Sequence, residues 1–191
     1  MTETPKSSST FPGVKIDLSN CILPDEILND QTPSEQDGLD SITETQLRST
    51  GCELIQHSGK LLKLPQTAMA TAQVLYQRYF YAKSFIKHDM EMMSMAAIWL
   101  ASKVEEEPRR ARDIINVFTR MEQHREEMEV QPIELNESYK RKKDDLVKAE
   151  RFMLKELGFC VHVEHPHKLV VILIAQILKM GENTKLIQTA W

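Results

Sequence analysis

Apolar residues follow a helical period along most of this chain. From about residue 41 onward they recur every three or four positions, and Pro, Gly or short polar runs separate the periodic stretches. No stretch shows the alternation of apolar and polar residues that is typical of a half-buried strand. We therefore expect an all-α domain, with helices at about 41–59, 65–80, 89–107, 110–126, 137–157 and 166–180 and a last fragment at 184–191.

The third and sixth of these helices carry the longest apolar runs. Between residues 92 and 101 only Ser94 is not apolar, so every face of the third helix needs a neighbour, and this helix should lie in the middle of the bundle. The sixth helix contains the β-branched run at 170–172, which could instead form a buried strand. The proline at position 166 and the length of the run favour a helix.

Residues 1–36 have a different composition. Ser and Thr are frequent, four of the eight prolines lie before residue 40, and no apolar period is sustained. Such a segment cannot bury enough surface to offset the entropy of ordering it. We expect a disordered tail over residues 1–36, although the short apolar patch at 21–28 could dock on the domain as an arm.

Charge and length limit the kinds of function. The chain has 191 residues, 41% of them hydrophobic, and 24 basic against 28 acidic residues give a formal net charge of −4. This balance leaves no overall basic field to attract nucleic acid or an anionic membrane, and the apolar stretches are too short to span a bilayer. No Gly-rich phosphate loop, nucleophile elbow or HExxH motif occurs, so we expect no catalysis, no small-molecule substrate and no cofactor.

Two charged residues stand where the helical pattern requires apolar ones. Glu150 shares an inward face with Leu146 and Met153, and Lys103 lies seven positions after Ala96 on another inward face. Burying a single charge is costly, so two opposite charges on inward faces favour an ion pair, or groups aimed at the backbone of another molecule. The alternative is that each lies near a helix end and reaches water, Lys103 by extending along its stem.

Two other clusters are weaker signals. Cys160, His162, His165 and His167 are metal-ligand residue types, but a structural zinc site brings together two ligand pairs from separated turns, so we expect no metal. The basic block at 140–143 could serve in nuclear import or touch nucleic acid, yet a solvated surface is the simpler interpretation. Direct binding of nucleic acid is therefore not expected.

Several segments resemble the cyclin box, the helical repeat of the cyclin family. The resemblance is carried by residues 52–55, 101–106 (Ala-Ser-Lys-Val-Glu-Glu) and 150–159. Residues 108–118 and 163–169 are similar to the cyclin L branch, which is linked to transcription and splicing. This similarity implies a first cyclin repeat of five helices at 37–161 and the start of a second repeat at 162–191.

The resemblance implies a regulatory function without chemistry of its own. The first repeat of a cyclin binds a cyclin-dependent kinase by packing on the regulatory helix of the kinase. A Lys–Glu pair of the family, which holds the backbone near that kinase helix, matches Lys103 and Glu150. By the same matching, the apolar positions of the kinase-facing surface are Val104, Leu154, Phe159 and Val161.

One family position differs in this chain. Arg48 matches an arginine of the first helix, but Gln77 replaces its usual acidic partner in the second helix. The change removes an ion pair, so we expect Arg48 to find another acceptor.

The resemblance also implies a partner and a location. The partner would be a cyclin-dependent kinase of the PITSLRE type or a related transcriptional kinase, and the location would be the nucleus. We further expect a truncated product whose segment 165–180 lacks the second-repeat helices that would bury it. Two functions stay open, namely activation of the kinase, or binding as a truncated module or scaffold that does not activate it.

Overall fold

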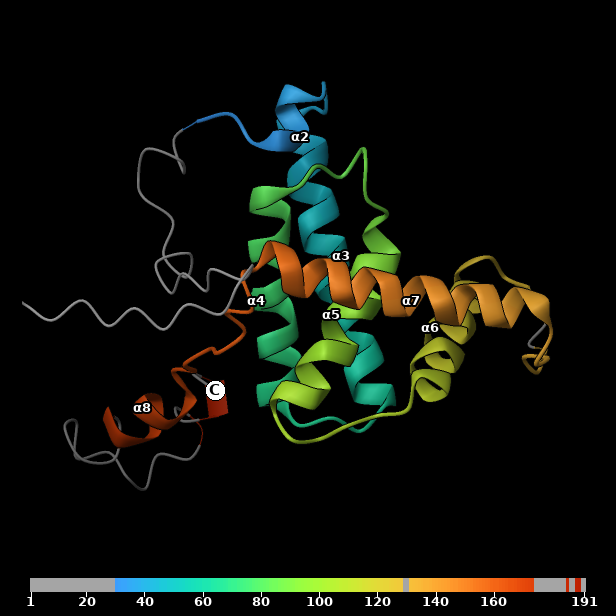
Figure 1. Ribbon diagram of the computed structural model, residues 1–191. Coiled ribbons are helices and arrows are strands. Elements are labelled where there is room, and N and C mark those ends of the chain that lie inside the picture. The colour runs from blue at the N-terminus through green and yellow to red at the C-terminus, as the bar shows by residue number, and fades with distance from the viewer. Residues whose placement is uncertain (1–29, 129–130, 174–184, 186–187, 190–191) are drawn as a thin grey trace, which may run out of the picture.

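The structure, a computed structural model, describes residues 30–128, 131–173, 185 and 188–189. Within these residues the chain forms helices and no strand, so the predicted all-α class is confirmed there. No helix in this part of the chain is both long enough and apolar enough to cross a bilayer. The helices are α2 (Pro33–Gln36), α3 (Ser41–Leu61), α4 (Gln66–Ala82), α5 (Met90–Val104), α6 (Ala111–Arg125), α7 (Glu137–Glu156) and α8 (His167–Ile172), as Figure 1 shows.

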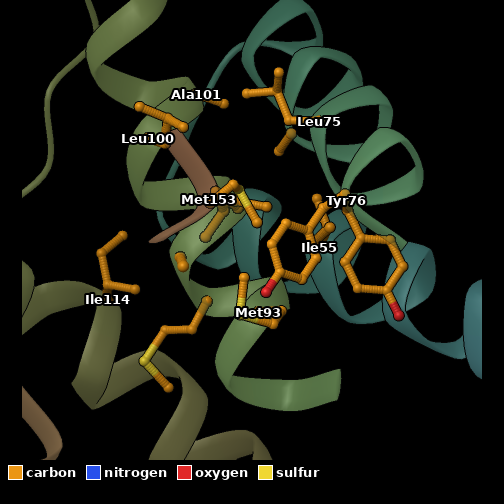
Figure 2. Packing of buried hydrophobic residues seen from close by; sticks show 14 of the residues in the cluster. Ile55, Leu75, Tyr76, Met93, Leu100, Ala101, Ile114 and Met153 are labelled. Atoms are coloured by element: carbon orange, nitrogen blue, oxygen red, sulfur yellow. The ribbon is translucent and has the colours of Figure 1, made fainter. Parts of the chain in front are cut away.

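Helix α5 is the centre of the bundle, as its apolar composition predicts. Asp89 caps its first turn by accepting a hydrogen bond from the amide of Met92. The helix contacts α3, α4, α6 and α7, and α7 crosses in front of it in Figure 1. Its buried side chains meet those of the four surrounding helices, and Figure 2 shows this packing around Met93, Leu100, Ala101, Ile114 and Met153.

Helices α3 and α4 approach closely because one of them carries a glycine at the contact. Gly51 is buried, and a Cβ at this position would overlap the hydroxyl group of Tyr76. The Tyr76 ring is fully buried, and its hydroxyl donates a hydrogen bond to the carbonyl oxygen of Leu47 at 3.0 Å. The inward face of α4 is fully buried, since its apolar residues Ala68, Ala72, Leu75, Tyr79 and Phe80 have no exposed surface.

Helix α5 ends earlier than the sequence predicts. The predicted helix reaches about residue 107, directly before Pro108, but the last helical residue is Val104. Glu106 takes a left-handed backbone conformation (φ 59°), and the amide of Glu107 donates to the carbonyl oxygen of Ser102 at 2.8 Å. This pattern of hydrogen bonds ends the helix at Val104, before Pro108 can end it.

The predicted disordered tail needs correction at its end. Thr32 caps α2 in a reciprocal capping box with Glu35, so residues 33–36 form a helical turn. Ser34 is buried and accepts a hydrogen bond from the amide of Phe85 at 3.1 Å. Polar side chains, rather than an apolar period, hold this turn on the domain. Residues 1–29, which include the apolar patch at 21–28, lie outside the described residues.

Helix α8 follows the bundle after a short connection. Residues 167–172 are helical, so the helix predicted there is confirmed and the strand alternative is wrong. Leu169 and Leu173 are 60% and 47% exposed. The rest of the predicted helix, residues 174–180, and most of the fragment at 184–191 lie outside the described residues.

Candidate functional site

Lys103 and Glu150 come together from two helices that cross. Lys103 lies in the last turn of α5, seven residues after the fully buried Ala96. Glu150 lies on α7 between Leu146 and Met153, both of which have no exposed surface. Because α5 and α7 pack against each other, their inward faces bring the two charges to the same place.

The two side chains form an ion pair. The Lys103 ammonium donates to Oε1 of Glu150 at 2.6 Å, so the predicted pairing is confirmed. The Glu150 side chain is 10% exposed, whereas that of Lys103 is 41% exposed and also reaches water. The ammonium lies 3.6 Å from the centre of the Trp99 ring, which adds a cation–π interaction that the sequence did not suggest. Trp99 is held by a hydrogen bond from its indole nitrogen to the carbonyl oxygen of Arg109.

Apolar side chains surround this pair along both helices. Val104 directly follows Lys103, and Leu154 lies one turn after Glu150 on the same face of α7. Val104, Leu154 and Val161 are half-buried and pack against the core, so each also presents part of its side chain to solvent. Phe159 differs from them, because 54% of its surface is exposed.

Phe159 is held outward by an unusual backbone. Gly158 and Phe159 both have left-handed conformations, with φ of 58° and 60°. The Phe159 amide donates to the carbonyl oxygen of Leu154 at 2.9 Å, which closes the end of α7. A bulky side chain at positive φ is rare and costs free energy, and such residues concentrate at functional sites. The turn thus leaves an aromatic ring exposed at the end of α7.

A buried threonine fixes the segment that follows this turn. The Thr71 hydroxyl, on α4, donates to Oε1 of Glu105 at 2.6 Å and lies 2.7 Å from Nε2 of His165. Thr71 has no exposed surface, and the side chains of Glu105 and His165 are 24% and 13% exposed. These contacts join α4, the end of α5 and the segment after α7, and thereby hold His165 against the bundle. Nothing in the helical period indicates this cluster, because the three residues are far apart in sequence.

Arg48 finds the acceptors that the Gln77 substitution requires. Its guanidinium donates to Oε1 of Glu44, one turn earlier on α3, at 2.9 and 2.5 Å. It also donates to the side-chain oxygen of Gln77 and to the carbonyl oxygen of Phe80, each at 3.0 Å. Glu44 in turn accepts a hydrogen bond from the hydroxyl of Thr32, so the arginine links α3, α4 and the cap of α2.

The structure describes both of the weaker clusters, at 160–167 and at 140–143. In the described part of the chain, no group of three or more histidine, cysteine or carboxylate side chains is arranged to hold a metal ion. In the basic block at 140–143, Lys140 pairs with Glu137, and Lys142 lies 3.2 Å from Glu122 and 3.3 Å from the hydroxyl of Thr119. Two of the four cations of this block therefore pair with groups of the domain itself.

Comparison with known proteins supports the resemblance. The chain matches the family model described as the cyclin N-terminal domain over residues 20–162. Similar curated proteins include cyclin-L2 of Homo sapiens and cyclin-L1 of Gallus gallus, each 56% identical over 181 residues, and cyclin-L1 of Homo sapiens, 53% identical over 181 residues. Each alignment covers 95% of this chain, which spans only 34% of the length of each relative. Because the family match takes in every helix from α3 to α7, the chain belongs to the cyclin family and is most like cyclin L.

Proposed function

We propose that this chain is a regulatory subunit that binds and activates a cyclin-dependent kinase associated with transcription and splicing, of the PITSLRE type or a related type. The chain itself performs no catalysis in this proposal. Membership of the cyclin family supports a kinase partner. The choice of kinase rests on the similarity to cyclins L.

The Lys103–Glu150 pair is the observation that carries the proposal. A charge pair between two helices, with a half-exposed ammonium and apolar neighbours, offers both hydrogen-bonding groups and contact area to a docking helix. Truncating a charged group at the centre of an interface commonly costs about 2 kcal/mol or more. The kinase-contacting residues in this proposal are Lys103, Val104, Glu150, Leu154, Phe159 and Val161.

A pull-down with the purified kinase tests the binding step. The variant Lys103→Ala/Glu150→Ala should bind at least about ten-fold more weakly than the unmodified chain. A matched control is Lys148→Ala/Asp145→Ala, which removes another lysine–carboxylate pair of α7 whose side chains are 74% and 54% exposed. The proposal is wrong if the first variant binds the kinase as tightly as the control does while its helical circular dichroism is intact.

Binding without activation is the second candidate function. The chain spans 34% of the length of its relatives, so binding and activation are tested separately. A kinase assay with added chain separates the two functions. Stimulated phosphorylation of a substrate supports an activator, and saturable binding without stimulation supports a decoy or scaffold.

Nuclear localisation is a further part of the proposal. The basic block at 140–143 supports it, since Arg141 and Lys143 are exposed and available to an import receptor. A fluorescent fusion of the chain should concentrate in the nucleus and should lose that concentration with Arg141→Ala/Lys143→Ala. A cytoplasmic distribution of the unmodified fusion would contradict this part.

A further inference from the structure

The outer face of α6 carries a hollow that the kinase-binding surface does not use. Its volume is about 280 Å³, and it is lined by Arg112, Asn116 and Arg120 of α6 and by Pro132 and Ile133 of the following loop. The three residues of α6 are spaced by four positions, so they share one face of the helix. The inward face of the helix, with Ile114, Ile115 and Phe118 buried, points the other way.

The loop wall of the hollow is fixed to the domain. Ile133 is half-buried and packs against the core, so the loop is anchored beside α6. The side chain of Gln123 reaches the carbonyl oxygen of Gln131 at 3.5 Å, which adds a second contact between loop and helix. These contacts therefore hold the hollow in shape. Its loop wall, with Pro132 and Ile133, is apolar, and its α6 wall is polar.

Of the residues that the structure describes, those lining the hollow carry two positive charges and no negative one. Arg48, Arg109 and Arg125 each reach a carboxylate at 2.5, 3.4 and 3.2 Å. Among the described residues, neither Arg112 nor Arg120 has an ion-pair partner. Two guanidinium groups around one small hollow, with no described carboxylate in its lining, are complementary to an anionic ligand.

We propose that this hollow binds a phosphorylated serine or threonine in an extended segment of another protein. A phosphoserine carries between one and two negative charges near pH 7 and offers three acceptor oxygens. The two guanidinium groups match that charge, the Asn116 amide supplies a further donor, and Pro132 and Ile133 contact the carbon atoms of the flanking chain. The site lies outside the proposed kinase contacts, so it does not depend on the proposed function.

The size and surroundings favour a compact phosphate over a nucleic acid. The hollow of about 280 Å³ has room for one phosphorylated side chain, since a water molecule takes about 30 Å³ in the liquid. Glu126 and Glu127, just after the end of α6, are exposed and would repel a nucleic-acid backbone that continued in that direction. A single phosphate on a peptide avoids that repulsion.

Titration of the full chain with short peptides tests the proposal by nuclear magnetic resonance. The probe is a five-residue alanine peptide with one central phosphoserine, and the comparison is the same peptide with serine. Saturable changes in the Nε–Hε signals of Arg112 and Arg120 are expected with the phosphorylated peptide only. Arg112→Ala, Arg120→Ala and Asn116→Asp should each weaken binding about ten-fold or more, the last by placing a carboxylate in the hollow.

Arg151→Ala is the matched control, because this arginine is also exposed on a helix but lies outside the hollow. It should leave the affinity for the phosphopeptide within two-fold of the unmodified chain. The proposal is overturned if the signals of all exposed arginines shift together without saturation, or if the three variants bind the peptide normally. Tighter binding of oligouridine than of the phosphopeptide to the same arginines would also overturn it, in favour of a nucleic-acid site.

Discussion

Lys103 and Glu150 form a pair whose members are buried to different extents. Their charged atoms are 2.6 Å apart, but 41% of the lysine side chain is exposed, against 10% of the glutamate side chain. The ammonium also has the ring of Trp99 as a second neighbour. Without the lysine, the buried carboxylate would lose its counter-charge. Without the carboxylate, the ammonium would still contact water and the Trp99 ring.

This difference predicts unequal effects of neutralising each partner. Lys103→Met keeps the aliphatic stem but leaves a buried carboxylate without its cation, and should lower the free energy of unfolding by about 1 kcal/mol. Glu150→Gln leaves an ammonium that still reaches water, and should cost less. Urea denaturation of both variants measures the difference. Equal losses, or a larger loss for Glu150→Gln, would contradict the prediction.

Local pattern was enough to predict much of the fold and the charged pair. An apolar run without polar faces placed α5 in the centre, and the helix predicted at about 137–157 is α7, which ends at Glu156. Lys103 and Glu150 were found because a charge on an inward helical face breaks a regular period. Such interruptions are visible in sequence, since the period itself identifies the face that must be buried.

Contacts made by isolated polar side chains could not be predicted in the same way. The hydroxyl of Thr71 meets His165 from 94 positions away, and neither residue interrupts a period. The turn at 33–36 has no apolar stripe, although Thr32 and Glu35 have the spacing of a capping box, which is a signal that could have located it. The early end of α5 depends on the backbone conformation of Glu106, which no composition rule indicates.

The contact between Gly51 and Tyr76 predicts a large effect of a single methyl group. A Cβ at Gly51 would overlap a rigid, fully buried ring, whereas a Cβ at Gly59 would overlap the flexible side chain of Met69. Gly51→Ala should therefore destabilise the domain by about 2 kcal/mol or more, and Gly59→Ala by distinctly less. Thermal unfolding monitored by circular dichroism measures the loss of stability in each variant. A larger loss for Gly59→Ala than for Gly51→Ala would show that α3 and α4 can move apart.

The cap of α2 predicts that one hydroxyl supports the turn at 33–36. Thr32 accepts from the amide of Glu35 and donates to Glu44, so Thr32→Val should lower the free energy of unfolding by about 1 kcal/mol. The control is Thr45→Val, because the Thr45 hydroxyl bonds only to the carbonyl oxygen of Ser41 within α3. Amide hydrogen exchange should increase at Phe85, whose amide donates to Ser34, in the Thr32 variant alone. Unchanged exchange there would contradict the prediction.

The surroundings of His88 predict that the folded chain loses stability in mild acid. Burial against the Tyr79 and Phe152 rings, together with the nearby charge of Lys83, lowers the pKa of His88 below its ordinary value. The unfolded chain then binds a proton more readily than the folded one, so stability falls as the pH drops through about 6.5.

Urea midpoints measured between pH 7.5 and pH 5.5 test this effect. The unmodified chain should lose stability over that range, and His88→Asn should lose less. Lys87 and Glu156 also act on this histidine, with Lys87 lowering and Glu156 raising its pKa. Glu156→Gln should therefore lower the pKa further, as followed by the imidazole resonances, and a rise instead would contradict the assignment.

The left-handed conformation of Phe159 predicts opposite effects on stability and on binding. Asparagine tolerates this conformation better than phenylalanine, so Phe159→Asn should raise the free energy of unfolding by about 1 kcal/mol. If the exposed ring contacts the kinase as proposed, the same variant should bind the kinase about ten-fold more weakly.

Lys63→Asn separates the two effects, because Lys63 has the same kind of backbone (φ 54°) but lies in the turn between α3 and α4, outside the proposed surface. It should gain stability without any change in kinase affinity. Denaturation of both variants measures the free energy of unfolding, and a pull-down of both measures the affinity for the kinase. Normal kinase binding by Phe159→Asn would remove Phe159 from the contact surface, and a less stable Phe159→Asn would show that the ring is worth more to the fold than its backbone conformation costs.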